Sequence, residues 1–274
     1  MRQTHVLYMC DGETIMKLIW VSDIHLNFIK DARPFCAELK EAKGDAILIT
    51  GDIAESHNVV PYVTEMAEQT GKPVYFVLGN HDFYGSSVAD VKSSVRSLGH
   101  LGSKQIVKLS DSVALIGVDG WGDTRNGDYE NSHLTMSDWI HIEDLRKEYG
   151  KGMDELKKQL MKLADSDALK LKRRVLKALE QGYTKIIMAT HVPPFEEVCL
   201  NAGRKSTPSG LPFFSSKCLG DAILPIAKKH PKVDFLWLSG HTHSRARHKP
   251  CNNLTSKVAK AEYYYPQIEE IFNV

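Results

Sequence analysis

The chain has 274 residues, of which 42% are hydrophobic, so it can bury a sizeable core within one domain. Its 35 basic and 34 acidic residues give a formal net charge of +1, which excludes long-range attraction for nucleic acid or an acidic membrane. No stretch approaches the roughly 18 continuous apolar residues that a membrane span requires. The five cysteines are an odd number without a Cys-x-x-Cys pair, which argues against a disulfide framework and predicts a cytoplasmic protein.

Five apolar runs of strand length follow one another along the chain, and each ends in polar residues. The runs span residues 17–22, 46–50, 74–78, 185–190 and 233–239. Continuous apolar runs of this length, bounded by glycine or polar residues, are typical of strands buried on both faces. Residues 31–43, 58–70 and 86–98 each begin near a capping residue and end before a glycine, which predicts crossover helices and a largely parallel sheet.

The polar endings contain seven candidate metal ligands. Asp23 and His25 follow the first run, Asp52 the second, Asn80 the third, His191 the fourth, and His241 and His243 the fifth. Because ligands bind at the carboxyl ends of strands in open α/β sheets, we expect these side chains to converge at one edge of the sheet. Alternate residues of an extended segment point the same way, so each pair two residues apart can reach one ion.

A single histidine at a strand end is more often a satisfied structural residue than a metal ligand. Seven polar groups at one edge are a different case, because each needs a partner and two carboxylates repel unless a cation lies between them. The set therefore predicts a site for two divalent metal ions. Imidazole nitrogens with carboxylate and amide oxygens, and no thiolate, favour Mn, Fe, Zn, Co or Ni over Ca or Mg, and among these we favour Mn.

The endings also form five ordered blocks. They read Asp23-x-His25, Gly51-Asp52, Gly79-Asn80-His81-Asp82, His191 and Gly240-His241-x-His243. These blocks resemble the motifs of the calcineurin-like metallophosphoesterases, and the resemblance covers the chain from about Met16 to the C-terminus. It implies an α/β fold of the metallophosphoesterase type, which is a four-layer α/β/β/α sandwich of two mixed β-sheets flanked by helices.

The same resemblance implies a role for each residue. One ion would be held by Asp23, His25, Asp52 and His243, and the other by Asp52, Asn80, His191 and His241, so that Asp52 bridges the pair. His81 would be the general acid or a contact to the substrate phosphate, and Asp82 would hold its imidazole. An imidazole beside a carboxylate suits the protonation of a departing alkoxide.

The rest of the chain predicts one domain. Residues 16–274 would form it, and residues 1–15 would be an N-terminal extension without chemistry of its own. Residues 105–108 and 112–118 predict a hairpin. A helical insert is expected at about 119–181, with helices over 135–149 and 153–181.

The insert and the C-terminal third give weaker signals. The basic cluster Lys170, Lys172, Arg173 and Arg174 is interpreted as a solvated helical face. Residues 196–217 are too irregular for a regular element, and residues 254–258 and 262–274 predict antiparallel edge strands. Substrate selectivity is expected from residues 119–134, 196–217 and 244–253. Arg204, Lys205 and Arg245 are candidate contacts to a charged substrate group, although surface exposure alone would explain each of them.

These features predict metal-dependent hydrolysis of phosphate esters through a dinuclear centre, with a metal-bound hydroxide as nucleophile and His81 as acid. Phosphodiesters rank slightly ahead of phosphomonoesters, because the Gly-Asn-His-Asp form of the third block occurs in cyclic-nucleotide phosphodiesterase relatives. The expected partner is a small phosphorylated substrate, and nothing indicates nucleic acid, a membrane or an oligomeric state. The alternative is a non-catalytic binding or scaffold protein with this fold, but all seven ligands and His81 are present, which favours the enzyme.

Overall fold

The computed structural model describes residues 16–274, and its strands form two mixed sheets and one short hairpin. The first sheet has the strand order β12-β1-β2-β3 and consists of β1 (Lys17–Val21), β2 (Ala46–Thr50), β3 (Val74–Val77) and β12 (Glu270–Asn273). β1, β2 and β3 run parallel, and β12 pairs antiparallel with β1 at the edge. The edge strand predicted at the C-terminus is confirmed, while the extension predicted for residues 1–15 lies outside the described residues.

The second sheet has the strand order β10-β11-β9-β6-β5-β4. Its strands are β4 (Val107–Lys108), β5 (Val113–Gly117), β6 (Lys185–Ala189), β9 (Asp234–Ser239), β10 (Ala246–Cys251) and β11 (Leu254–Val258). The predicted hairpin is formed by β4 and β5. The prediction of an antiparallel edge strand at 254–258 is wrong, because β11 runs parallel to β9 and the unpredicted strand β10 takes the edge.

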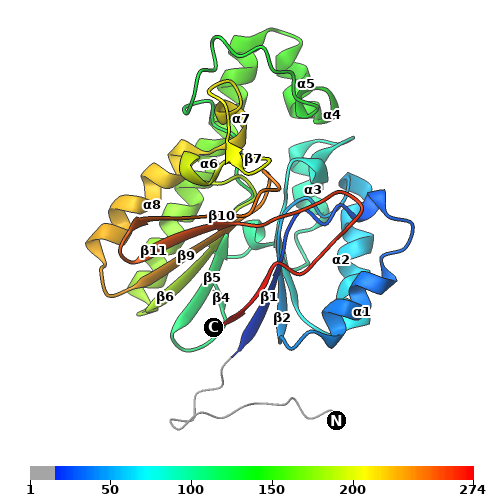
Figure 1. The fold of residues 1–274 in the computed structure, drawn as a ribbon, viewed down its shortest axis with the longest axis vertical. Helices are drawn as coiled ribbons and strands as arrows, with labels where there is room; N and C mark the ends of the chain where they lie inside the picture. Colours follow the sequence, from blue (N-terminus) through cyan, green and yellow to red (C-terminus); the bar gives the residue numbers. More distant parts are fainter. Residues whose placement is uncertain (1–15) are drawn as a thin grey trace.

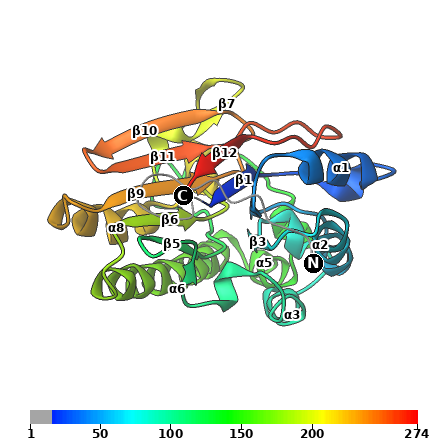
Figure 2. The same ribbon diagram turned by 90° about the horizontal axis from the view of Figure 1, so that it is seen from below.

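Helices cover the outer face of each sheet, so the molecule has four layers, as Figures 1 and 2 show. The first sheet is covered by α1 (Arg33–Glu41), α2 (Ser56–Thr70) and α3 (Val88–Ser94). The second sheet is covered by α6 (Met153–Glu180) and α8 (Lys217–Lys229). The predicted four-layer α/β/β/α sandwich is confirmed, and α3 is shorter than the helix predicted over 86–98.

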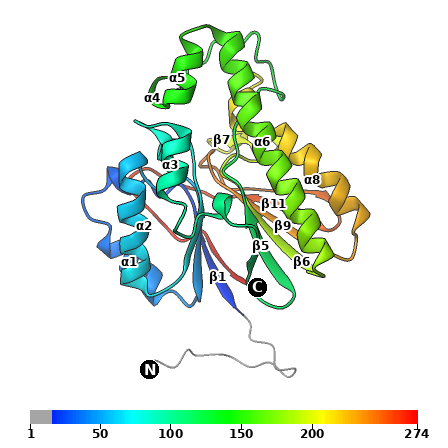
Figure 3. The same ribbon diagram turned by 180° about the vertical axis from the view of Figure 1, so that it is seen from behind.

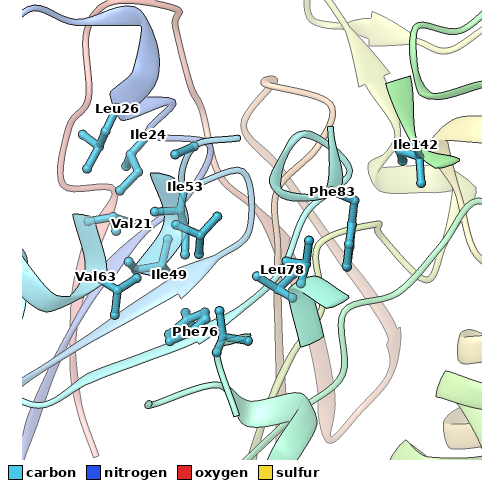
Figure 4. Close-up of a cluster of buried hydrophobic side chains, with 14 of the residues drawn as sticks. Val21, Ile24, Leu26, Ile49, Ile53, Val63, Phe76, Leu78, Phe83 and Ile142 are labelled. Carbon is cyan, nitrogen blue, oxygen red and sulfur yellow. The ribbon is translucent and has the colours of Figure 1, made fainter. Parts of the chain in front are cut away.

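Alternate residues of each buried strand enter two different cores. Leu18 and Trp20 of β1 lie in the core between the two sheets, together with Ile187 of β6. Ile19 and Val21 of the same strand lie in the core under the first layer of helices, part of which is shown in Figure 4. A third core lies between the second sheet and its helices. Two buried faces explain why the strand sequences are continuously apolar and do not alternate.

Only part of the predicted insert projects from one end of the sandwich, because α6 covers the second sheet. The segment predicted as one helix over 135–149 divides at Ile142 into α4 (Asp138–His141) and α5 (Glu143–Tyr149). Figure 1 shows these two helices at the top of the molecule, beyond the carboxyl ends of the parallel strands. Figure 3 shows α6 running from that end of the molecule along the second sheet.

The basic cluster on α6 does not form a uniform solvated face. Arg174 is 8% exposed, and its guanidinium donates to the backbone carbonyls of Leu101, Gly102 and Gly117 at 3.0, 2.8 and 2.7 Å. Leu101 and Gly102 belong to η3 (Leu101–Ser103), and Gly117 ends β5. The interpretation of Arg174 as a solvated residue is therefore wrong, because this side chain fastens α6 to the second sheet.

Residues 196–217 contain more regular structure than the sequence predicts. They include η4 (Glu196–Val198), the two-stranded hairpin of β7 (Leu200–Asn201) and β8 (Arg204–Lys205), and α7 (Leu211–Phe214). Two further single-turn helices, η1 (Leu26–Phe28) and η2 (His81–Phe83), follow β1 and β3. Short elements of this kind are below the length at which hydrophobic periodicity gives a signal.

None of the helices within residues 16–274 combines the length and the apolarity needed to cross a membrane.

Replacing Arg174 with leucine should destabilise the fold by about 2–5 kcal/mol, because three buried carbonyls lose a charged donor. The neighbouring Arg173 is exposed, so Arg173→Leu is a matched control that should change stability by less than about 0.5 kcal/mol. Urea unfolding midpoints of the two variants and the parent measure the difference. Equal midpoints for the two variants would contradict the role given to Arg174.

Candidate metal centre

The seven predicted ligands come together in the loops that follow five strands. The first sheet supplies Asp23, His25, Asp52 and Asn80, and the second supplies His191, His241 and His243. The expectation of one shared sheet edge is wrong in this respect, because the site lies where the carboxyl ends of two sheets meet. A hydrogen bond from His241 N to Asp23 Oδ1 at 2.9 Å joins the two sheets directly.

The backbone is left-handed at five of the seven positions. Asp23, His25, Asp52, His241 and His243 have φ values of 49°, 41°, 52°, 71° and 52°. Residues other than glycine adopt this region at a cost, although aspartate and histidine tolerate it better than most. Such strain collects at functional sites, where the surrounding structure holds it in place.

Four of the side chains form a first cluster. One ligand atom from each of Asp23, His25, Asp52 and His243 lies within 4.8 Å of all the others. His243 Nε2 lies 3.3 Å from Asp23 Oδ1 and 3.3 Å from His25 Nε2. The Asp52 Oδ2 atom lies 3.7 Å from His25 Nε2. Two carboxylates and two imidazoles therefore face one point.

The remaining side chains form a second cluster around His191. Its Nδ1 atom lies 2.9 Å from the backbone carbonyl of Thr50, which fixes the ring and turns Nε2 toward the site. Around Nε2 lie Asn80 Oδ1 at 3.0 Å, His241 Nδ1 at 3.2 Å and Asp52 Oδ2 at 3.5 Å. Asp52 Oδ2 thus belongs to both clusters.

This donor set fits divalent cations. Two acceptor oxygens, Asn80 Oδ1 and Asp52 Oδ2, and a second ring nitrogen, His241 Nδ1, converge on His191 Nε2, and a single proton cannot satisfy all of these contacts. The two buried carboxylates of Asp23 and Asp52 also need positive charge nearby. An ion in each cluster would meet both needs, with oxygen and nitrogen ligands that suit first-row transition metals.

The pKa shifts of the histidines agree with a site that attracts positive charge. Burial lowers the pKa of His25 to about 4 and that of His241 to about 3, so both rings are neutral near pH 7 and offer lone pairs. Burial disfavours a charge on His191 as well, yet the adjacent Asp52 carboxylate outweighs it and raises the pKa of His191 to about 10. A proton on His191 Nε2 and a bound cation would interact with the same oxygens, which are Asp52 Oδ2 and Asn80 Oδ1.

Two glycines of the sequence blocks are required by close approach. A Cβ atom on Gly79 would lie 2.2 Å from Asp52 Oδ1, and one on Gly240 would lie 2.1 Å from Asp23 Oδ2. Any side chain at these positions would displace a carboxylate. The glycines before Asn80 and His241 thus let the loops pack directly against the two aspartates.

His81 lies at the site, but Asp82 does not hold its imidazole. Both Asp82 oxygens accept backbone N–H groups, from Ile53 at 2.8 Å, Ala54 at 2.9 Å and Gly79 at 2.8 Å. The expected role of Asp82 is therefore wrong: this carboxylate fastens the loops after β2 and β3 together. The His81 ring stacks on Tyr84 with centroids 4.4 Å apart and lies 4.7 Å from the ring of His25.

The insert supplies a contact that the sequence did not indicate. Asp138 Oδ1, on α4, accepts from Asn80 Nδ2 at 2.9 Å and from the Tyr84 hydroxyl at 2.7 Å. The first bond fixes the orientation of the Asn80 amide and leaves Asn80 Oδ1 facing the second cluster. Neither Asp138 nor Tyr84 stands in a recognisable motif, so the sequence held no signal for them.

Asp119, two residues beyond the end of β5, is another residue that positions the site. Its backbone carbonyl accepts from His191 N at 2.7 Å, and its Oδ1 accepts from Leu78 N at 2.9 Å. Lys92 Nζ lies 2.9 Å from Oδ2, and His100 Nε2 lies 2.8 Å from Oδ1. Asp119 therefore connects the loop of His191 with the loop of Asn80. The end of an apolar strand was a usable signal here, because the other site loops begin in the same way.

Comparison with known proteins gives a family. A family model described as calcineurin-like phosphoesterase matches residues 16–245. Among curated proteins, no sequence matches this chain.

Two solved structures share the fold. A dimetal phosphatase from Danio rerio aligns with a TM-score of 0.56 and 14% identity, over 89% of this chain and 87% of that one. A phosphopantetheinyl hydrolase from Mycobacterium tuberculosis aligns with a TM-score of 0.64 and 11% identity, over 90% of this chain and 89% of that one.

Replacing Asp138 with alanine should weaken metal binding in the second cluster by about 10- to 100-fold, because the Asn80 amide loses the partner that orients it. Asp138→Asn is the matched control, since its Oδ1 can still accept from Asn80 and Tyr84. Titration of chelator-stripped protein with Mn²⁺ in isothermal calorimetry measures both variants. If the Asp138→Ala variant and the parent protein bind two ions equally tightly, this role of Asp138 is wrong.

Proposed function

Because this chain belongs to the calcineurin-like phosphoesterase family, we propose that its two clusters hold a pair of divalent metal ions with which it hydrolyses small phosphate esters. Because it belongs to this family, the protein is a phosphoester hydrolase. The observation that carries the proposal is the position of Asp52 Oδ2, which lies 3.7 Å from His25 Nε2 in one cluster and 3.5 Å from His191 Nε2 in the other. One carboxylate placed between two acceptor-rich clusters suits a bridging ligand.

The ligand assignment follows the clusters. The first ion would be held by Asp23, His25, Asp52 and His243, and the second by Asp52, Asn80, His191 and His241. Two ions, when bound, would polarise the phosphate and lower the pKa of a nearby water. Mn is the proposed metal, within a donor set that also suits Fe, Zn, Co and Ni.

The protein's own groups have separate tasks in this proposal. Asp52 is held by His81 N, which donates to its Oδ1 at 2.9 Å and so keeps Oδ2 between the clusters. The imidazole of His81 would protonate the departing ester oxygen. Its Nδ1 atom is buried, so Nε2 is the nitrogen that can reach the substrate. Stacking on Tyr84 holds the ring at the site without a carboxylate partner.

Phosphodiesters come first in this proposal and phosphomonoesters second, on the strength of the Gly79-Asn80-His81-Asp82 block. A scaffold protein that had lost turnover would be free to lose ligands or the acid. In this chain all seven donors and His81 lie together, so no observation favours the non-catalytic alternative.

Removal of metal should abolish hydrolysis of chromogenic aryl phosphate esters, and Mn²⁺ should restore it. Chelator-stripped protein is assayed with a paired monoester and diester before and after metal addition, and the rate ratio identifies the preferred ester class. Asp52→Asn serves as the control, because it keeps the side-chain size but should bind less metal and regain no turnover. If Mn²⁺, Zn²⁺, Fe²⁺, Co²⁺ and Ni²⁺ all fail to restore hydrolysis of either ester, the proposed function is wrong.

Replacing His81 with alanine should keep both metals bound and lower kcat by about 10²- to 10⁴-fold for esters with poor leaving groups. The loss should shrink for esters whose leaving oxygen needs no proton. Metal content by plasma mass spectrometry, together with rates over a series of aryl esters of graded acidity, makes the comparison. Equal losses across the series would assign His81 to phosphate binding and not to proton transfer.

A further inference from the structure

A pocket of about 250 Å³ opens beside the second-sheet side of the metal centre. His241 and His243 form its inner end, and Tyr263, Phe214, Ser206 and Thr242 line the rest together with the β7 residues Leu200 and Asn201. Its volume lies just below the range for small-molecule sites, which is about 300–1,000 Å³. A molecule of one or two fused rings would fill it.

Two aromatic side chains connect this pocket to the metal ligands. The ring of Tyr263 lies 4.6 Å from the ring of His25 and 5.0 Å from that of His243, measured between centroids. The ring of Phe214 lies 5.6 Å from that of His241. Tyr263 is 40% exposed and lines the pocket, so part of its ring remains available to a ligand.

Two residues of the lining carry buried hydroxyl groups without partners. Ser206 is 6% exposed, and within the described residues neither its Oγ nor the buried Oγ1 of Thr242 makes a hydrogen bond. Buried polar atoms are nearly always paired, so an unpaired pair of hydroxyls in one pocket is an uncommon feature. Rotation about the Cα–Cβ bond can turn either hydroxyl toward a bound molecule.

Among residues 16–274, the lining includes no side chain of aspartate, glutamate, lysine or arginine. Two of the three cations proposed from the sequence are paired with acids outside the lining: Lys205 Nζ lies 3.2 Å from Glu196 Oε1, and Arg245 Nε lies 2.6 Å from Glu269 Oε1. The third, Arg204, is exposed and also lies outside the lining. The expectation that these side chains contact a charged substrate group therefore has no support in the structure. A second phosphate in this pocket would find no lysine or arginine side chain in the lining formed by the described residues.

We propose that this pocket binds the alcohol portion of the phosphoester substrate, and that this portion is an uncharged ring with polar substituents. Tyr263 and Phe214 pack against the ring, and the hydroxyls of Ser206 and Thr242 bond to its substituents. The inference rests on the proposed function for the position of the phosphate, which lies at the adjacent clusters. It gives Tyr263 and Ser206 the role of specificity residues.

The test uses the free alcohol and the metal-free, full-length protein, so that binding is measured without turnover. 4-Methylumbelliferone supplies a fused ring with a carbonyl acceptor, glycerol an uncharged chain, and phenol-4-sulfonate a charged ring. Isothermal calorimetry should detect binding of the first, at least about tenfold weaker binding of the sulfonate, and none of glycerol. Tyr263→Ala should weaken binding of 4-methylumbelliferone by about tenfold, and Ser206→Ala by about 3- to 10-fold.

Tyr265→Ala is the matched control, because Tyr265 is 68% exposed and lies outside the lining. This variant should bind 4-methylumbelliferone with the same affinity as the parent. Unchanged affinity in both Tyr263→Ala and Ser206→Ala would overturn the inference, as would equal binding of the three probes. Hydrolysis of 4-methylumbelliferyl phosphate by the metal-loaded parent separates the two proposals. If the protein binds 4-methylumbelliferone but hydrolyses no ester, only the proposed function is refuted. If the hydrolysis rate is the same in Tyr263→Ala, Ser206→Ala and the parent, only the proposed role of the pocket is refuted.

Discussion

The buried Asp52 carboxylate is the group around which the rest of this structure is arranged. It is 2% exposed, and its Oδ2 lies near imidazole nitrogens contributed by the loops of both sheets. A buried carboxylate without compensating charge is costly, and Asp23 adds a second one to the same site. Protonation of His191 reduces the cost, as the raised pKa of this histidine shows. A pair of divalent cations would reduce it further, so the electrostatics of the site favour the ions that the proposed function needs.

The architecture explains how such a site can be assembled from distant parts of the sequence. Parallel strands direct their carboxyl ends to one end of each sheet, and packing of the two sheets through Leu18, Trp20 and Ile187 brings those ends together. The loops then hold one another by direct hydrogen bonds, as from His241 N to Asp23 Oδ1. Asp119 and Asp138 add further hydrogen bonds, which orient the loop of His191 and the amide of Asn80, respectively. Stability and function are therefore coupled, because the same bonds close the fold and aim the ligands.

The sequence predicts the part of this arrangement that depends on local pattern. Continuous apolar runs located all five site strands, and the polar residues at their ends included all seven donors of the two clusters. Contacts set by the direction of a side chain were not accessible in this way. Asp82 follows His81 in the chain, but the turn of η2 points its carboxylate at the backbone of Ile53 and Ala54. Arg173 and Arg174 look equivalent, yet one helical step places the first in solvent and the second in the core. The partner of Asn80 lies 58 residues away in a helix without a motif.

The central claim is that two ions share Asp52, and anomalous diffraction from crystals grown with Mn²⁺ tests it most directly. Data collected at the manganese absorption edge locate bound manganese independently of any activity assay. The account predicts two anomalous peaks, one in each cluster, both within coordination distance of the Asp52 carboxylate. A single peak at saturating Mn²⁺, or two peaks of which only one contacts Asp52, would contradict it.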